Sequence, residues 1–176
     1  NKHRFFLVKI LKDIYADPLL SVSLGFKGGT SLMFFYDLPR FSTDLDFDLI
    51  EMNNQPEAYR KIREIVRKYG AIHDEAQKFF GPLIVLDYGA GERKLKIEIS
   101  NRLFENRYVI KNLMGFNVKV MNISDMFAHK LCALLDRNTM ANRDIFDSWF
   151  FMQRQTPLNK NIVEHRMKLS LPVYIY

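Results

Sequence analysis

The sequence has one cysteine among its 176 residues, which excludes a disulfide framework and any zinc site built from cysteines. No apolar run approaches the roughly 20 residues that a membrane-spanning helix needs. The first ten residues include the cations Lys2, Arg4 and Lys9, and no small-residue cleavage site follows, so they do not resemble a secretory signal. We therefore expect a cytoplasmic protein without membrane contact.

Aromatic and basic residues, in contrast, are plentiful. Fifteen phenylalanines and a hydrophobic fraction of 48% predict a packed core and exclude global disorder. The 26 Lys and Arg residues outnumber the 20 Asp and Glu residues, which gives a net charge of +6. This surplus fits a polyanionic partner such as RNA or a nucleoside triphosphate, but charge alone does not establish one.

The hydrophobic periodicity predicts an α+β fold, with a mixed β-sheet flanked by helices and a helical C-terminal part. Helical spacing covers residues 5–14, 30–37, 56–69, 124–135 and 141–152, and strand patterns cover 22–26, 44–50, 83–87, 94–99 and 117–121. We expect a core domain over residues 1–121 and the helical part over 122–176. Because the chain begins without methionine and ends in the apolar, strand-like segment 167–176, we expect it to continue beyond these residues.

The segment Asp44-Leu-Asp46-Phe-Asp48 carries acids at alternating positions. Residues two apart in a strand project from the same face, so Asp44 and Asp46 would be able to share a divalent cation. Mg²⁺ is typically held by one or two carboxylates together with substrate phosphates and water. The alternative is the solvated face of an edge strand, which this short motif alone does not exclude.

A second candidate motif, Lys27-Gly28-Gly29-Thr30-Ser31, joins a predicted strand to a predicted helix. Glycines at such a junction let backbone N–H groups approach a phosphate, and the helix dipole and the hydroxyls favour the anion further. A Gly-Gly pair by itself is more often an ordinary turn, and the P-loop pattern is absent.

Glu98 is a candidate third acidic ligand. It alternates with Leu95, Ile97 and Ile99 in a predicted strand, where it would complete a three-carboxylate metal site with Asp44 and Asp46. The alternative is an ordinary surface strand, because Lys96 occupies the same face. Glycines 89 and 91 are expected to form only the hairpin turn before this strand.

These motifs in this order resemble the AbiEii family of abortive-infection toxins, within the nucleotidyltransferase β superfamily. The resemblance rests on residues 27–32, Lys-Gly-Gly-Thr-Ser-Leu, and 39–47, Pro-Arg-Phe-Ser-Thr-Asp-Leu-Asp-Phe. It continues in residues 128–131, Ala-His-Lys-Leu, and 143–147, Arg-Asp-Ile-Phe-Asp. It spans roughly residues 1–152 and implies a nucleotidyltransferase fold.

The resemblance implies a role for each of the candidate residues. The triphosphate would be held by the turn residues and by Arg40, whose alternative role is to tie its loop to Asp37. The turn residues are Gly28, Gly29, Thr30 and Ser31. Mg²⁺ or Mn²⁺ would be bound by Asp44 and Asp46, and Glu98 falls where the superfamily's third carboxylate would lie, although two carboxylates can suffice. Lys130 would contact the triphosphate, and Asp144 would be the downstream acidic catalytic residue.

The implied enzyme transfers a nucleoside monophosphate from an NTP to a macromolecule, with RNA such as the tRNA 3′ end as the expected acceptor and a protein hydroxyl as the alternative. It would be the toxin of a type IV toxin–antitoxin system in phage defence, with an antitoxin that forms no stable complex with it. Three alternatives are a nucleotidyltransferase for small, antibiotic-like molecules, a catalytically silent NTP- or RNA-binding module, and a structural protein. The helical C-terminal part is short for the family, in which this part often helps to define the acceptor.

Several neighbouring residues are expected to be structural. We interpret His129 as a hydrogen-bonded structural histidine and Cys132 as a small core residue. The aromatic run 149–151 is predicted to be buried against a helix rather than exposed for base stacking. Arg137 and Arg143 are equally compatible with phosphate contacts and with ion pairs to nearby aspartates.

Overall fold

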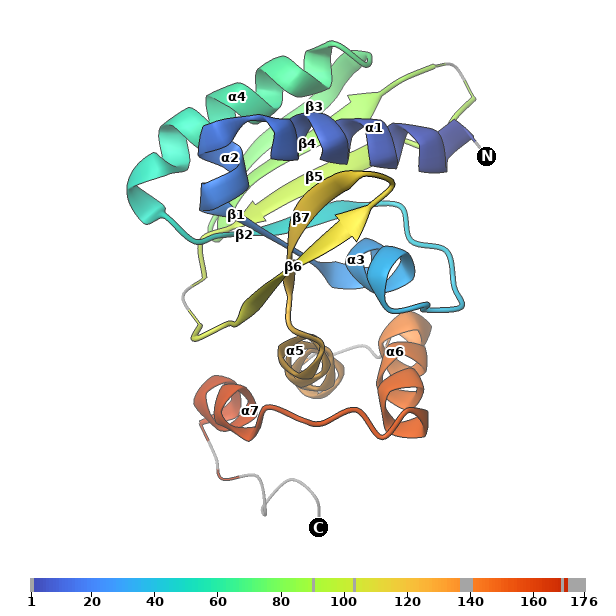
Figure 1. Cartoon of the computed structure of the whole chain (residues 1–176), viewed down its shortest axis with the longest axis vertical. Coiled ribbons are helices and arrows are strands. Elements are labelled where there is room, and N and C mark those ends of the chain that lie inside the picture. The colour runs from blue at the N-terminus through green and yellow to red at the C-terminus, as the bar shows by residue number, and fades with distance from the viewer. Residues whose placement is uncertain (1, 90, 103, 137–140, 169, 171–176) are drawn as a thin grey trace. The chain divides into compact units, whose positions relative to one another are not determined.

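The structure is a computed structural model, and it describes residues 2–89, 91–102, 104–136, 141–168 and 170 (Figure 1). Its helices are α1 (Lys2–Ala16), α2 (Pro18–Ser23), α3 (Gly28–Phe35), α4 (Gln55–Arg67), α5 (Ile123–Asp136), α6 (Asn142–Gln153) and α7 (Lys160–Met167), with a short 3-10 helix η1 (Met52–Asn54). Its strands are β1 (Leu24–Lys27), β2 (Leu45–Leu49), β3 (Ala71–Lys78), β4 (Gly81–Asp87), β5 (Leu95–Ser100), β6 (Tyr108–Leu113) and β7 (Phe116–Met121). None of the helices within these described ranges has both the length and the apolar character needed to cross a membrane.

The chain divides into two compact units. Unit 1 comprises Asn1–Leu103 and Val109–Val120, and unit 2 comprises Phe104–Tyr108 and Met121–Tyr176. The strands form one seven-stranded sheet in the order β3-β4-β5-β2-β1-β7-β6. The sheet is mixed, because β2 runs antiparallel to β1 and parallel to β5. The predicted α+β class with a mixed sheet is therefore confirmed.

Strand β2 lies in the centre of the sheet and has two different faces. Leu45, Phe47 and Leu49 are buried, and the Phe47 ring lies 5.3 Å from the Phe26 ring of β1 between centroids. The alternate positions carry the acidic residues Asp46 and Asp48. Because β2 is paired on both sides, its carboxylates do not lie on a solvated edge strand, and that alternative is wrong.

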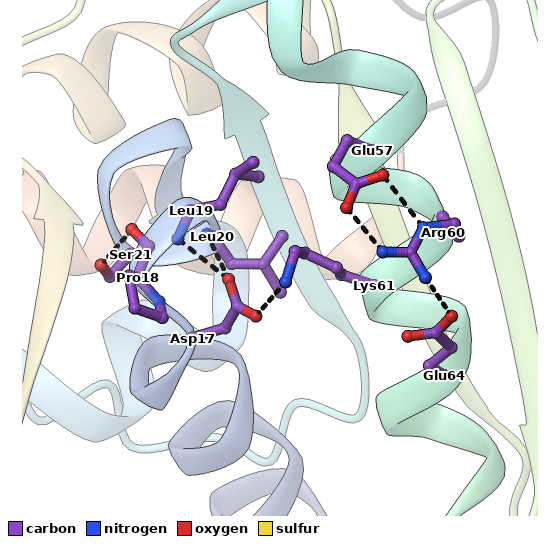
Figure 2. A network of polar contacts seen from close by, with 9 residues as sticks. All are labelled: Asp17, Pro18, Leu19, Leu20, Ser21, Glu57, Arg60, Lys61 and Glu64. Atoms are coloured by element: carbon purple, nitrogen blue, oxygen red, sulfur yellow. Dashed lines mark hydrogen bonds and ion pairs between the residues drawn. The ribbon is translucent and has the colours of Figure 1, made fainter.

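Helices α1, α2 and α4 of unit 1 pack against one another and are joined by the polar network in Figure 2. Asp17 caps α2, because its Oδ1 accepts hydrogen bonds from the backbone N–H groups of Leu19 (2.9 Å) and Leu20 (3.1 Å). Its Oδ2 accepts one from Lys61 Nζ of α4 at 2.7 Å. Burial acts to raise the pKa of Asp17, but these hydrogen bonds outweigh it and lower the pKa.

We predict that Asp17→Ala lowers the free energy of unfolding by about 2 kcal/mol, because it removes both the cap and the ion pair. Asp17→Asn retains the cap and should cost about 1 kcal/mol or less. Since the pKa of Asp17 is lowered in the folded state, its charge stabilises the fold fully at pH values above the ordinary pKa of about 3.9. That contribution disappears as the pH falls through the lowered pKa.

Urea denaturation followed by circular dichroism between pH 7 and pH 2 measures these differences. The gap between the wild type and Asp17→Asn should be constant near neutral pH and close at the acidic end. Equal losses for the alanine and asparagine variants would show that the cap contributes nothing.

Unit 2 contains α5, α6 and α7, and α5 contacts both of the other helices. Ala128 and Cys132 of α5 are buried against Ile162 and Val163 of α7, so Cys132 is a core residue as predicted. The helix begins after Asn122, whose side chain accepts a hydrogen bond from Ser124 N at 3.0 Å. Asn122 therefore caps the start of α5.

The buried Asp125 joins the elements of unit 2. It accepts hydrogen bonds from the guanidinium and the backbone N–H of Arg107, both at 2.6 Å, and from the Asn159 amide at 2.7 Å. Burial acts to raise the pKa of Asp125, but this hydrogen bonding holds it below its ordinary value.

Some predicted elements were wrong or incomplete. Helix α2, which Asp17 and Pro18 start, was not predicted, and it includes residues 22 and 23 of the strand expected over 22–26. Strands β3 and β6 and helix α7 were not predicted, since their exposed positions lack a clear apolar period. Residue 167 of the predicted strand-like end lies in α7, and 171–176 lie outside the described residues.

Candidate active site

The Gly-Gly turn links β1 directly to α3. Gly28 begins the helix and has φ +80°, a backbone conformation that residues with a side chain rarely adopt. The first N–H groups of a helix have no intrahelical partner, so this turn offers backbone donors and the positive end of a helix dipole to an anion. The fully buried Ser31 Oγ also has no hydrogen-bond partner in the described part of the chain.

Strand β2 and the loop that leads into it both approach the turn closely. A Cβ built on Gly28 would lie 2.3 Å from Asp46 Oδ2. A Cβ built on Gly29 would lie 2.7 Å from Ser42 Oγ and 2.9 Å from Arg40 Nη2. The structure therefore brings four predicted residues together, Gly28, Gly29, Arg40 and Asp46, and adds Ser42, which the sequence analysis did not single out.

Asp44 is held against the same turn through its backbone. Thr30 Oγ1 donates a 2.5 Å hydrogen bond to the Asp44 carbonyl oxygen, and Thr43 Oγ1 donates a 3.3 Å bond to Asp44 Oδ1. Because the one hydroxyl hydrogen of Thr30 is used in this way, its backbone N–H is the group left to meet a phosphate. The predicted residues Thr30 and Asp44 are therefore in direct contact.

The residues at this turn fit a divalent cation. Asp44 and Asp46 are half-buried and supply hard carboxylate oxygens, the donors that Mg²⁺ takes alongside phosphates and water. No group of three or more His, Cys, Asp and Glu able to hold a metal occurs among the described residues. A metal site made of two protein carboxylates and the phosphates of a bound substrate is consistent with that finding.

Glu98 is placed beside Asp46 by the strand register. The two are partners in the parallel β2–β5 pair, so they occupy the same face of the sheet. Glu98 Oε2 also lies 3.7 Å from Lys78 Nζ, in a pair that is largely exposed. The role of Glu98 as a third ligand stays a prediction.

Lys27 and Asp48 form an ion pair that the sequence analysis missed. Lys27 Nζ lies 2.5 Å from Oδ1 of the buried Asp48. The pair joins β1 to β2 beside the turn, and it neutralises the third acid of the alternating segment. The lysine directly precedes Gly28 in the sequence, but its contact with Asp48 needs the β1–β2 pairing, which sets Lys27 opposite Asp46 and diagonal to Asp48.

The second predicted set, Lys130 and Asp144, lies in unit 2. Lys130 Nζ is 2.8 Å from Asp147 Oδ2 and 3.9 Å from Asp144 Oδ1, and all three side chains are largely buried. Asp147, which was considered as a partner for arginine, is therefore the nearer partner of Lys130. The two acids lie three residues apart on α6, a spacing that places them on one helix face.

The neighbouring residues in unit 2 have structural roles. His129 is hydrogen-bonded to Asn106 Oδ1 at 2.7 Å and to Arg166 Nη1 at 3.0 Å, so it is a hydrogen-bonded histidine as predicted. Asp136 pairs with Arg166 at 3.3 Å, whereas Arg137 lies outside the described residues. Arg143 is exposed.

The aromatic run of α6 is only partly buried. Phe150 and Phe151 are buried, as predicted, and the Phe151 ring stacks on the Phe127 ring of α5 at 4.9 Å between centroids. Trp149 is 52% exposed, so its prediction as a core residue is wrong. Consecutive residues on a helix point in different directions, and an unbroken aromatic run therefore cannot all face one neighbour.

Replacing Gly28 with alanine should lower any turnover at this site by about 100-fold, in line with the cost of misplacing a reacting group by about 1 Å. The new Cβ would collide with Asp46 Oδ2, and the positive φ would be strained. Gly115→Ala is a matched control, since Gly115 also has a positive φ (+91°) but no atom lies within 4 Å of its added Cβ. Initial-rate kinetics on both variants, after circular dichroism confirms folding, tests this; equal activities would contradict it.

The sequence profile described as "Nucleotidyl transferase AbiEii toxin, Type IV TA system" matches residues 9–171. A comparison with curated proteins gives no match.

Among solved structures, JHP933 from Helicobacter pylori is similar with a TM-score of 0.59 and 23% identity, over 95% of this chain and 72% of that one. A second Helicobacter pylori structure gives 0.60 and 23% identity, over 95% and 74%. An antigenic nucleotidyltransferase-like protein from Paracoccidioides brasiliensis gives 0.54 and 13% identity, over 84% and 77%. These likenesses establish a shared fold.

Proposed function

The chain belongs to the AbiEii family of nucleotidyltransferases, the toxins of type IV toxin–antitoxin systems, and from this premise we propose its reaction. The enzyme transfers a nucleoside monophosphate from an NTP to a macromolecular acceptor, and the acceptor is RNA such as the tRNA 3′ end. The observation that supports the proposal is the close approach of Asp46 to the Gly28 turn, because a carboxylate beside a helix start can bind a cation together with a phosphate.

The turn is proposed to hold the triphosphate. Free backbone N–H groups at the start of α3 meet the phosphate oxygens, and the unpartnered hydroxyl of Ser31 supplies a further donor. Arg40, whose guanidinium lies next to Gly29, adds a fixed positive charge with several donors. These groups bind the β- and γ-phosphates and orient the α-phosphorus toward the acceptor.

Asp44 and Asp46 are proposed to hold Mg²⁺ or Mn²⁺, with Glu98 as an outer partner on the adjacent strand. The ion, when bound, supplies a Lewis acid that neutralises phosphate charge and lowers the pKa of a hydroxyl. The hydrogen bonds from Thr30 and Thr43 keep Asp44 in position without reorganisation during the reaction.

The reaction forms a bond between the acceptor hydroxyl oxygen and the α-phosphorus, and it breaks the bond from that phosphorus to the bridging oxygen of pyrophosphate. We propose that Lys130 stabilises the charge of the departing pyrophosphate. Asp144 orients Lys130 or accepts the proton of the attacking hydroxyl. Their ion pair in unit 2 supports a linked role.

The biological setting is also a proposal. The protein acts in the cytoplasm as the toxin of a type IV system in defence against phage, and its antitoxin opposes it without a stable complex. Residues 1–121 form the nucleotidyltransferase core, and 122–176 form a helical part that serves the same reaction.

Incubation with each α-³²P-labelled NTP, Mg²⁺ and total cellular RNA tests the proposal. We expect label on a tRNA-sized band, and the labelling nucleotide identifies the base. Label on a protein band would retain the chemistry and replace the acceptor. Label on a small molecule only would favour an antibiotic-type enzyme, and NTP binding without any transfer would favour a silent module.

A further inference from the structure

A groove in unit 1 lies apart from the Gly28 turn and is not used by the proposed reaction. It has a volume of about 450 Å³, within the range of ligand-binding clefts. One wall is a stripe of α1 made of Arg4, Phe5, Val8, Lys9 and Lys12. The other wall is the β6–β7 hairpin, through Met114 and Phe116. We name this feature the α1 groove.

The residues that line the α1 groove are either apolar or positively charged. Arg4, Lys9 and Lys12 are exposed, and no acidic residue is among those that line the groove. The three cations follow one another over eight residues of helix, or about 12 Å. Such a row attracts an extended polyanion more strongly than a single anionic group.

The apolar residues of the groove are unusually exposed. Phe5 is 56% exposed and Met114 is 74% exposed. Lys9 Nζ lies 5.4 Å from the centre of the Phe5 ring, so the aromatic surface and the charge are adjacent. Aromatic rings beside cations in a groove are the combination that binds single-stranded nucleic acid, because bases stack on the rings while phosphates meet the charges.

The groove also has a structural link to the helix that carries the candidate active site. The Arg4 guanidinium lies 5.5 Å from the centre of the Phe34 ring of α3. Phe34 is six residues after Gly28, which corresponds to about 9 Å along α3. A strand bound in the groove would therefore lie near the far end of the helix whose start is proposed to hold the triphosphate.

We propose that the α1 groove binds a single-stranded segment of the RNA acceptor. The identity of the occupant rests on the proposed function, which requires an RNA acceptor. The three cations and the exposed aromatic surface favour RNA over an acidic peptide, since a peptide needs no flat stacking surface. The groove contributes affinity for the RNA substrate at a place away from the reacting groups.

The test measures binding of a fluorescein-labelled single-stranded 12-nucleotide RNA by fluorescence anisotropy at several salt concentrations. Lys9→Glu combined with Lys12→Glu should weaken binding by about tenfold or more. It should also reduce the slope of log K against log salt by roughly 1.4, or about 0.7 for each lost phosphate contact. Phe5→Ala should weaken binding by about 5- to 100-fold through lost stacking, with little change in that slope.

Arg67→Glu is the matched control, because Arg67 is an exposed cation on α4 outside the groove. It should leave the affinity within about twofold of the wild type. A thermal melt of each variant confirms folding. Unchanged affinity in both the charge-reversed and the Phe5→Ala variants would overturn the proposal.

Measurement of nucleotidyl transfer on the same variants separates this proposal from the proposed function. Transfer to RNA with an unchanged KM for RNA in the groove variants would overturn the groove and leave the function intact. Loss of RNA binding in these variants, together with a wild type that transfers no nucleotide, would support the groove and overturn the function.

Discussion

Replacement of Asp44 and Asp46 together by asparagine is expected to lower nucleotidyl transfer by at least about 1,000-fold, equivalent to about 4 kcal/mol of transition-state stabilisation. Both carboxylates are half-buried beside the Gly28 turn, so asparagine keeps their size and removes only the charge that a cation needs. Thr30 bonds to the Asp44 backbone and not to its carboxylate, and this contact survives the substitution.

Asp74→Asn is the control for this experiment. Asp74 is an exposed acid on β3 of the same sheet, outside the candidate site, and its loss should change the rate by less than about twofold. Rates are measured with saturating NTP over a series of Mg²⁺ and Mn²⁺ concentrations. A doubly substituted enzyme that retained wild-type kcat would show that the two carboxylates are not the metal-binding groups.

Lys130→Ala is the second prediction with a large expected effect. It leaves Asp144 and the fully buried Asp147 without their lysine, and breaking a buried ion pair in this way costs about 3–5 kcal/mol of folding stability. Transfer should also fall by about 100-fold or more, because the proposed contact with the triphosphate is lost.

A compensated variant distinguishes the two effects. Lys130→Met combined with Asp147→Leu replaces the closer ion pair by apolar side chains, which is often close to neutral for stability. We expect it to recover at least half of the lost stability, measured by urea denaturation, and to remain inactive. Recovery of activity together with stability would show that Lys130 serves only the fold of unit 2.

The sequence was informative where a motif is short and local. The alternation in 44–48 predicted a strand with acids on one face, and the glycines predicted the junction between β1 and α3. Both depend on neighbouring residues only. The central place of β2 depends on pairing with β1 and β5 from distant parts of the chain, and the sequence pattern could not supply it.

Long-range contacts explain what the sequence analysis missed around the site. The Lys27–Asp48 pair needs the β1–β2 register, and the Lys130–Asp147 pair needs α5 packed on α6. Strand β3 was not recognised because most of its residues are exposed and its order comes from pairing with β4. Charge and apolar period alone do not determine such partners.

The most direct test of the central claim compares α-³²P and γ-³²P forms of the preferred NTP with RNA and Mg²⁺. Transfer of a nucleoside monophosphate predicts that RNA is labelled only by the α form, while the γ label is recovered in pyrophosphate. Label from the γ form on RNA would instead show phosphoryl transfer, and it would contradict the account even if Asp44 and Asp46 proved essential.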